Sequence, residues 1–140
     1  MTLPFPPAPF PLARPRRLRA SPWVRRLVDA AIKDAVGTGA TDPDGLIPDC
    51  IKAIKDAAPE IGVMCDVALD CYTDHGHDGI VADGRIVNDD SLERLAEQAF
   101  LQAHAGADIV APSDMMDGRI QAVREALEAN GFHDTMILAY

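Results

Sequence analysis

A short stretch after residue 65 carries a high density of side chains that bind metal ions or move protons. Within thirteen residues it holds four aspartates and two histidines: Asp66, Asp70, Asp74, His75, His77 and Asp78. Carboxylate oxygens and imidazole nitrogens at this spacing suit a hard divalent cation or general acid–base catalysis. The same residues are equally typical of a solvated acidic loop. Spacing alone therefore leaves two alternatives open, a metal or catalytic site and a plain loop.

A second polar segment follows an apolar run near the C-terminal end of the sequence. It reads Pro112-Ser113-Asp114-Met-Met-Asp117-Gly-Arg119. A serine and aspartates in such a place can contact a substrate. They can also simply decorate and cap the N-terminus of the helix that follows.

The elements that must position these residues alternate between two hydrophobic periods. Helical spacing predicts helices over residues 48–58, over a segment capped by residues 88–91 and ending at Ala105-Gly106, and over residues 117–130. Short apolar runs predict strands over residues 61–69, 107–112 and 135–140. The stretch 70–90 has three glycines, six aspartates and little periodicity, which predicts a long loop.

Alternating helices and strands predict an α/β fold with parallel strands, either a doubly wound sheet or a barrel. Both polar segments directly follow predicted strands, and parallel α/β folds place their sites at the C-terminal ends of strands. A closed (β/α)₈ barrel needs roughly 250 residues. We therefore expect three strands to be only part of such a barrel.

The N-terminal residues 1–29 differ in composition from the remainder. They contain six arginines and one aspartate, whereas residues 30–140 hold seven basic and twenty-one acidic residues. Seven of the eleven prolines precede residue 23, so a regular helix or sheet is not expected there. We interpret residues 1–29 as an extended arm that lies on an acidic surface of its own or a neighbouring subunit, and residues 30–140 as the folded domain.

Composition excludes several classes of protein. The net charge of −9 argues against a partner that is nucleic acid, and no apolar run approaches the roughly 18 residues that span a bilayer. Cys50, Cys65 and Cys71 are an odd number of cysteines, which gives no complete disulfide framework and favours a reducing cytoplasm. Cys65 lies on an apolar strand and is interpreted as a small core residue.

Several motifs together resemble one family. They are Asp66-Val-Ala-Leu-Asp70, then Tyr-Thr-x-His75-Gly-His77-Asp78-Gly79, then Asn88-Asp89, and above all Ala105-Gly-Ala-Asp-Ile-Val-Ala-Pro-Ser-Asp-Met-Met-Asp-Gly-Arg119. This pattern strongly resembles porphobilinogen synthase, also called 5-aminolevulinate dehydratase. The similarity runs from about residue 32 to residue 140, and residues 14–23 look like that family's N-terminal arm. Between the two, around residues 28–31, the resemblance implies that the first part of the family's barrel is absent.

The resemblance implies a TIM barrel, a homo-octamer and the condensation of two 5-aminolevulinate molecules to porphobilinogen with loss of water. By motif, Asp66 and Ser113 would act at the amino and carboxylate end of the substrate pocket, with Asp70 beside them. Asp70 and Asp78 stand where one branch of the family has zinc-binding cysteines, and the third such position is Ala68. This sequence therefore looks like the aspartate-rich, magnesium-responsive branch.

In that family both substrates are held as Schiff bases on two lysines, which come after the segment ending at Tyr140. Lys33, Lys52 and Lys55 match no catalytic motif. The expectation is thus an enzyme of tetrapyrrole and heme biosynthesis, a hydro-lyase, of which residues 1–140 alone are inactive. The alternative is a catalytically inactive fragment that at most binds divalent cations or associates with full-length subunits.

Overall fold

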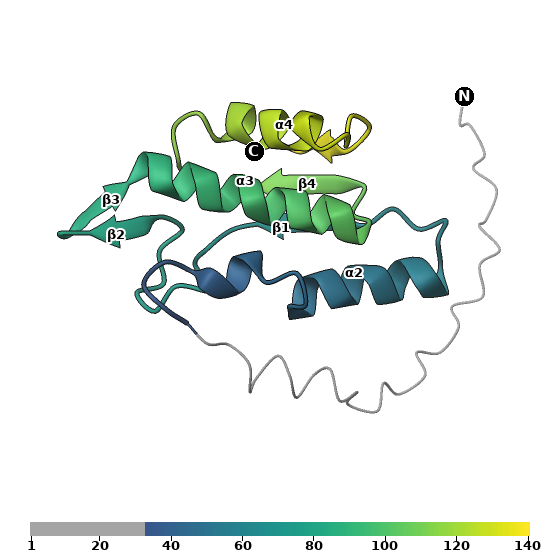
Figure 1. The fold of residues 1–140 in the computed structure, drawn as a ribbon, viewed down its shortest axis with the longest axis horizontal. Helices are drawn as coiled ribbons and strands as arrows, with labels where there is room; N and C mark the ends of the chain where they lie inside the picture. Colours follow the sequence, from purple (N-terminus) through teal and green to yellow (C-terminus); the bar gives the residue numbers. More distant parts are fainter. Residues whose placement is uncertain (1–32) are drawn as a thin grey trace, which may run out of the picture.

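A computed structural model describes residues 33–140 (Figure 1). The predicted arm, residues 1–29, lies outside the described residues. In chain order the elements are η1 Thr38–Thr41, α2 Leu46–Ala57, β1 Met64–Val67, β2 Ile80–Ala82, β3 Arg85–Val87, α3 Asn88–Ala105, β4 Ile109–Pro112, α4 Arg119–Ala129 and β5 Met136–Ile137. The predicted alternation of helices and strands is confirmed, and the strands are shorter than their apolar runs.

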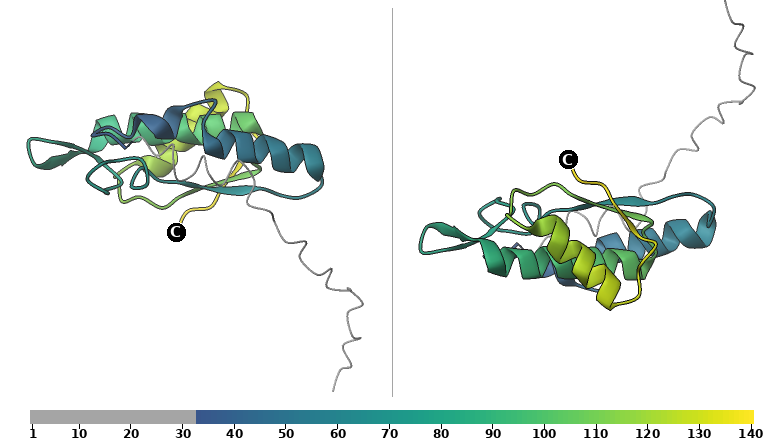
Figure 2. Two further views of the ribbon diagram at one scale, coloured as in Figure 1. Left: turned by 90° about the horizontal axis from the view of Figure 1, so that it is seen from below. Right: turned by 90° about the horizontal axis from the view of Figure 1, so that it is seen from above.

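The main sheet is parallel, as the element order predicted. Its order is β1-β4-β5, and Cys65 pairs with Val110, which pairs in turn with Ile137. Figure 2 shows α2, α3 and α4 on one face of this sheet, with no described helix on the other. A doubly wound sheet carries helices on both faces, whereas a barrel carries them only outside. The layout therefore favours the partial barrel over the doubly wound alternative.

The predicted loop over residues 70–90 contains a hairpin that the periodicity did not indicate. Strands β2 and β3 pair antiparallel, Ile80 with Val87 and Ala82 with Arg85. Asp83 and Gly84 form the connection, and both have positive φ, 51° and 71°. Asp-Gly is the sequence that a two-residue type I′ turn prefers, because both central residues must adopt positive φ. The loop prediction was wrong for residues 80–87.

The start of α3 also differs from the predicted cap. The helix begins at Asn88, its N-cap is Val87, and no side chain caps it. Residues 88–91 therefore form the first turn. Within that turn the buried Ser91 hydroxyl donates to the Val87 carbonyl at 2.6 Å and accepts from the Ile80 amide at 2.9 Å. Ser91 thus ties the hairpin to the helix. The predicted end of the helix at Gly106, with φ 113°, is confirmed.

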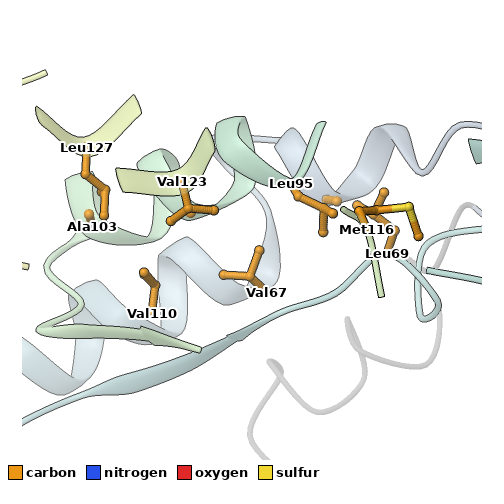
Figure 3. Packing of buried hydrophobic residues seen from close by; sticks show 10 residues of the cluster. Val67, Leu69, Leu95, Ala103, Val110, Met116, Val123 and Leu127 are labelled. Atoms are coloured by element: carbon orange, nitrogen blue, oxygen red, sulfur yellow. The ribbon is translucent and has the colours of Figure 1, made fainter. Parts of the chain in front are cut away.

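The hydrophobic core lies between the sheet and helices α3 and α4 (Figure 3). The inner faces of α3 and α4 supply much of it. Its buried members are Ala40, Val67, Leu69, Leu95, Ala99, Ala103, Val110, Met116, Val123 and Leu127. A smaller cluster surrounds Ile51 of α2, and Cys65 packs against it half-buried, in line with its interpretation as a core residue. Ile54, three residues after Ile51 on α2, is 42% exposed.

The opposite face of the sheet is uncovered in the described part of the chain. Side chains alternate between the two faces of a strand. Because Val67 and Val110 face the helices, Met64, Asp66 and Met136 face the other way, and all three are exposed. In a closed barrel this face is the interior. Among the described residues no helix is long and apolar enough to cross a membrane.

One ion pair joins α2 to the residues that precede β1 and β4, at the N-terminal end of the sheet. Lys55 Nζ of α2 lies 2.6 Å from Asp108 Oδ2, and the Val63 amide donates to the same oxygen at 2.6 Å. The hydrogen bond from Lys55, followed by that from Val63, lowers the pKa of Asp108 below its usual value of 3.8. A lowered pKa in the folded state means that folding favours the carboxylate.

This pair gives a testable pH dependence. The stability contributed by Asp108 should be complete well above pH 3.8 and should be lost as the pH falls through the lowered value. We expect Asp108→Asn to lower the urea midpoint at neutral pH and to have a smaller effect at about pH 3. The exposed Asp134→Asn is the matched control. An equal effect of Asp108→Asn at both pH values would contradict the prediction.

Candidate active site at the C-terminal ends of the strands

Asp66 lies on the uncovered face of β1 because the strand is fixed from behind by α3. Gln102 Nε2 donates to the Asp66 carbonyl at 2.7 Å, and Gln98 Nε2 donates to the Ala68 carbonyl at 3.1 Å. Both glutamine side chains are buried. These bonds satisfy main-chain oxygens that the short ladder leaves open and set the orientation of the strand end. The sequence prediction missed both glutamines, since a polar residue on a helix is normally assigned to solvent.

The loop after β1 is closed by the carboxylate of Asp78. Its Oδ1 accepts hydrogen bonds from the amides of Leu69 at 3.0 Å and Asp70 at 3.2 Å. The buried Thr73 hydroxyl donates to the His77 carbonyl at 2.8 Å and tightens the same loop. Asp78 thus holds the turn together, while the Asp70 side chain projects into solvent.

The two histidines also take part in the loop. His77 Nδ1 accepts from the Gly79 amide at 2.9 Å, and His75 Nδ1 accepts from the His77 amide at 3.2 Å. A nitrogen that accepts an amide proton is not free to bind a metal ion. These contacts give both histidines a structural function in the loop. They involve only the Nδ1 atoms, so the metal or catalytic site stays a prediction.

The donors in this loop decide whether a metal ion fits. Among the described residues, no group of three or more His, Cys, Asp or Glu side chains is arranged to hold an ion. Asp70 and Asp78 supply two hard carboxylates, which suit Mg²⁺ because this ion is usually bound by one or two carboxylates and keeps several waters. They do not form a complete metal site by themselves.

Ser113 lies at the end of β4, beside β1. Its amide donates to the Val67 carbonyl at 3.3 Å, which extends the parallel ladder. Asp66 pairs with Ala111, and Ser113 is two residues further on, so both side chains belong to the same uncovered face. The alternative of helix capping is wrong, because α4 begins at Arg119 with Gly118 as its N-cap and no side-chain cap.

Asp114 is a buried carboxylate next to Ser113. Its Oδ1 accepts from the Met116 amide at 2.7 Å, which forms the tight turn after β4. Burial raises the pKa of the Asp114 carboxyl above 3.8. Asn88 clamps the same turn from α3, since it accepts from the Asp117 amide at 2.8 Å and donates to the Asp117 carbonyl at 3.1 Å.

Tyr140, which follows β5, contacts the candidate site. Its hydroxyl donates to Asp66 Oδ1 at 3.4 Å, although the two residues are 74 apart in the sequence. No sequence signal could have found this contact, because it depends on the pairing of β4 with β5. The structure therefore brings Asp66, Ser113 and Tyr140 to one edge of the sheet, with Asp70 and Asp78 in the adjoining loop.

A parallel sheet with helices on one face and polar side chains at the C-terminal strand ends is the layout of a (β/α) barrel enzyme. Comparison with known proteins makes the assignment specific. The sequence model of the delta-aminolevulinic acid dehydratase family matches residues 27–140. The chain belongs to this family, and the resemblance in the motifs is confirmed.

Individual relatives agree with the family match. A delta-aminolevulinic acid dehydratase from Bradyrhizobium diazoefficiens is 53% identical over 112 residues, which are 80% of this chain and 32% of that protein. A chloroplastic dehydratase from Oryza sativa subsp. japonica is 53% identical over 114 residues, 81% of this chain and 27% of its own length.

A solved structure is similar as well. It is a Toxoplasma gondii delta-aminolevulinic acid dehydratase (porphobilinogen synthase) in complex with the reaction product porphobilinogen. It has a TM-score of 0.76 and 50% identity, and it covers 78% of this chain and 32% of that one. The partial barrel is therefore confirmed as the fold. The chain spans about a quarter to a third of the length of these relatives.

Proposed function

We propose that this chain supplies one side of a porphobilinogen synthase active site, in which two 5-aminolevulinate molecules condense to porphobilinogen with loss of water. The observation that carries the proposal is the convergence of Asp66 and Ser113 on one face of adjacent parallel strands, in a member of the dehydratase family. The activity is that of a hydro-lyase in tetrapyrrole and heme biosynthesis.

The chemistry of these two side chains fits the substrate. The carboxylate of Asp66 is exposed and can accept charge-assisted hydrogen bonds from the substrate ammonium group. The same carboxylate can take a proton when the amine becomes a nucleophile. The half-buried Ser113 can donate its hydroxyl proton to a substrate oxygen. The two residues would bind and orient the substrate rather than form a covalent bond with it.

We further propose Mg²⁺ rather than zinc as the ion of the loop after β1. Ala68, Asp70 and Asp78 offer no thiolate, and Asp78 uses only Oδ1 in its two bonds to main-chain amides. Asp70 and Asp78 would hold a hydrated ion, and the positive charge of that ion would stabilise negative charge that develops on the substrate. A homo-oligomer, an octamer in the intact family, and a cytoplasmic location complete the proposal.

The exposed apolar side chains on the uncovered face of the sheet favour a second, non-catalytic function. Met64, Met136 and Leu138, all exposed, lie on the uncovered face of the sheet. Exposed apolar surface of this kind is typical of an interface. In this alternative the chain associates with full-length subunits or binds divalent cations, and Asp66 has no substrate.

A chimera tests the proposed function. Residues 33–140 would replace the matching segment of the Bradyrhizobium diazoefficiens relative, and porphobilinogen formation from 5-aminolevulinate would be measured with Mg²⁺ and with zinc. We expect product with Mg²⁺. Asp66→Asn should lower kcat/KM by about 10 to 100-fold, and Ser113→Ala by about 5 to 10-fold, as expected for one lost charged or neutral hydrogen bond.

The matched control is Asp83→Asn, the same chemical change at the tip of the β2–β3 turn. Asparagine tolerates the positive φ of 51° at this position, so the turn should persist. If Asp66→Asn behaves like Asp83→Asn in an active chimera, Asp66 is not a substrate contact. A correctly folded chimera without product would favour the non-catalytic alternative.

A further inference from the structure

A chain of contacts connects the ends of all three parallel strands. On β1, Asp66 accepts from the Tyr140 hydroxyl at 3.4 Å. Beyond β5, the main-chain oxygen of Tyr140 accepts from Arg119 Nη2, also at 3.4 Å. Arg119 in turn begins helix α4, directly after the turn that carries Ser113 and Asp114. Each contact is long for a hydrogen bond. Whether these contacts can fix the position of Tyr140 therefore depends on what holds Arg119 in place.

Asp114 is the group that faces the arginine. Its side chain is fully buried, and its Oδ2 lies 3.7 Å from Arg119 Nε. Neither of these two atoms has a hydrogen-bond partner within the described residues, although both are buried. A buried carboxylate oxygen without a partner is costly, and a guanidinium nearby compensates part of this cost. The other carboxylate oxygen accepts from the Met116 amide at 2.7 Å, so burial and this hydrogen bond set the orientation of Asp114.

A second arginine on the same helix gives a natural comparison. Arg124 donates from Nη1 to the Thr135 carbonyl and from Nη2 to the Phe132 carbonyl, each at 2.8 Å. It therefore holds the segment that leads into β5. Arg119, less than two helical turns earlier, contacts the segment that leaves β5. The two arginines fix opposite ends of one strand, and only Arg119 is linked to Asp66.

We propose that Asp114 and Arg119 position Tyr140, and that Tyr140 in turn orients the carboxylate of Asp66 towards the substrate. The three residues are positioning residues in this scheme, because they act on the substrate through Asp66. The substrate role of Asp66 rests on the proposed function. The positioning itself does not, since all its contacts exist in the chain without ligand.

Fluorine NMR on the full 140-residue chain tests the proposal. The sequence has two tyrosines, so labelling with 3-fluorotyrosine gives one resonance for Tyr140 and one for Tyr72, which packs against the core. Tyr140→Phe assigns the pair. We expect Asp66→Asn, Arg119→Ala and Asp114→Asn each to move the Tyr140 resonance by more than its linewidth. Arg119→Lys should return it only in part, because lysine lacks the planar fork of arginine.

Two controls separate positioning from general destabilisation. Arg124→Lys loosens the other end of β5 and should leave the Tyr140 resonance in place. The Tyr72 resonance should stay unchanged in every variant, which reports an intact core. The proposal would be overturned if the Tyr140 chemical shift were unchanged by Asp66→Asn and Arg119→Ala. It would also be overturned if Arg124→Lys changed this shift as much as those variants do. No 5-aminolevulinate is added, so the result does not depend on whether the chimera is active.

Discussion

A polypeptide of residues 1–140 is expected to form no porphobilinogen from 5-aminolevulinate and to trap no adduct on reduction with borohydride. The reaction proposed for the family proceeds through an iminium ion, which needs a deprotonated lysine amine beside the substrate. Lys55 Nζ is held by Asp108 and the Ile61 carbonyl, and Lys52 Nζ by the Pro43 carbonyl. Both lie on α2, which packs against the outer face of the sheet.

Lys33 is the remaining lysine, and its exposed side chain has no desolvated surrounding that would activate its amine. Product formation would be followed by a colorimetric assay of porphobilinogen, and adducts by mass spectrometry after borohydride treatment. The Bradyrhizobium diazoefficiens relative, treated identically, is the positive control. Either porphobilinogen or a reduced adduct on any of the three lysines would show that this prediction is wrong.

The sequence predicted the elements of the barrel well where the hydrophobic pattern extended over many residues. The inner faces of α3 and α4 and the parallel order of the strands follow from apolar spacing alone. The hairpin of β2 and β3 was missed, because each strand has three residues and the many glycines and aspartates around them mask any alternation. The Asp83-Gly84 pair was the available signal. The choice between barrel and doubly wound sheet required the three-dimensional arrangement of the helices.

The candidate site was predictable only in part, for a physical reason. Asp66 and Ser113 follow apolar strands, and the C-terminal ends of parallel strands share one edge, so their proximity could be expected. Gln102, Arg119 and Tyr140 act through contacts between residues distant in sequence, which no local pattern encodes. The different roles of Asp70 and Asp78 in the acidic loop could not be predicted from the sequence either. Asp78 accepts hydrogen bonds from main-chain amides, whereas Asp70 is exposed.

The largest expected effect on stability is that of Leu95→Ala. Leu95 of α3 has no exposed surface, and Figure 3 shows its side chain beside Leu69 and Met116. Truncation removes buried methyl groups and leaves a cavity, which costs about 2 to 5 kcal/mol. Small domains have a total stability of about 5 to 15 kcal/mol. A cost of this size should be visible as a clearly lower urea midpoint in circular dichroism.

The same cavity should also reach the candidate site, because the two residues that line it carry the site's turns. The Leu69 amide donates to Asp78, and the Met116 amide donates to Asp114. We therefore expect Leu95→Ala to increase amide hydrogen exchange at both turns as well as to lower the midpoint. Leu138→Ala is the control of identical chemistry. Leu138 is 45% exposed on the uncovered face, and its truncation should change stability by no more than about 0.5 kcal/mol. Equal losses for the two leucines would mean that the core does not pack as Figure 3 shows.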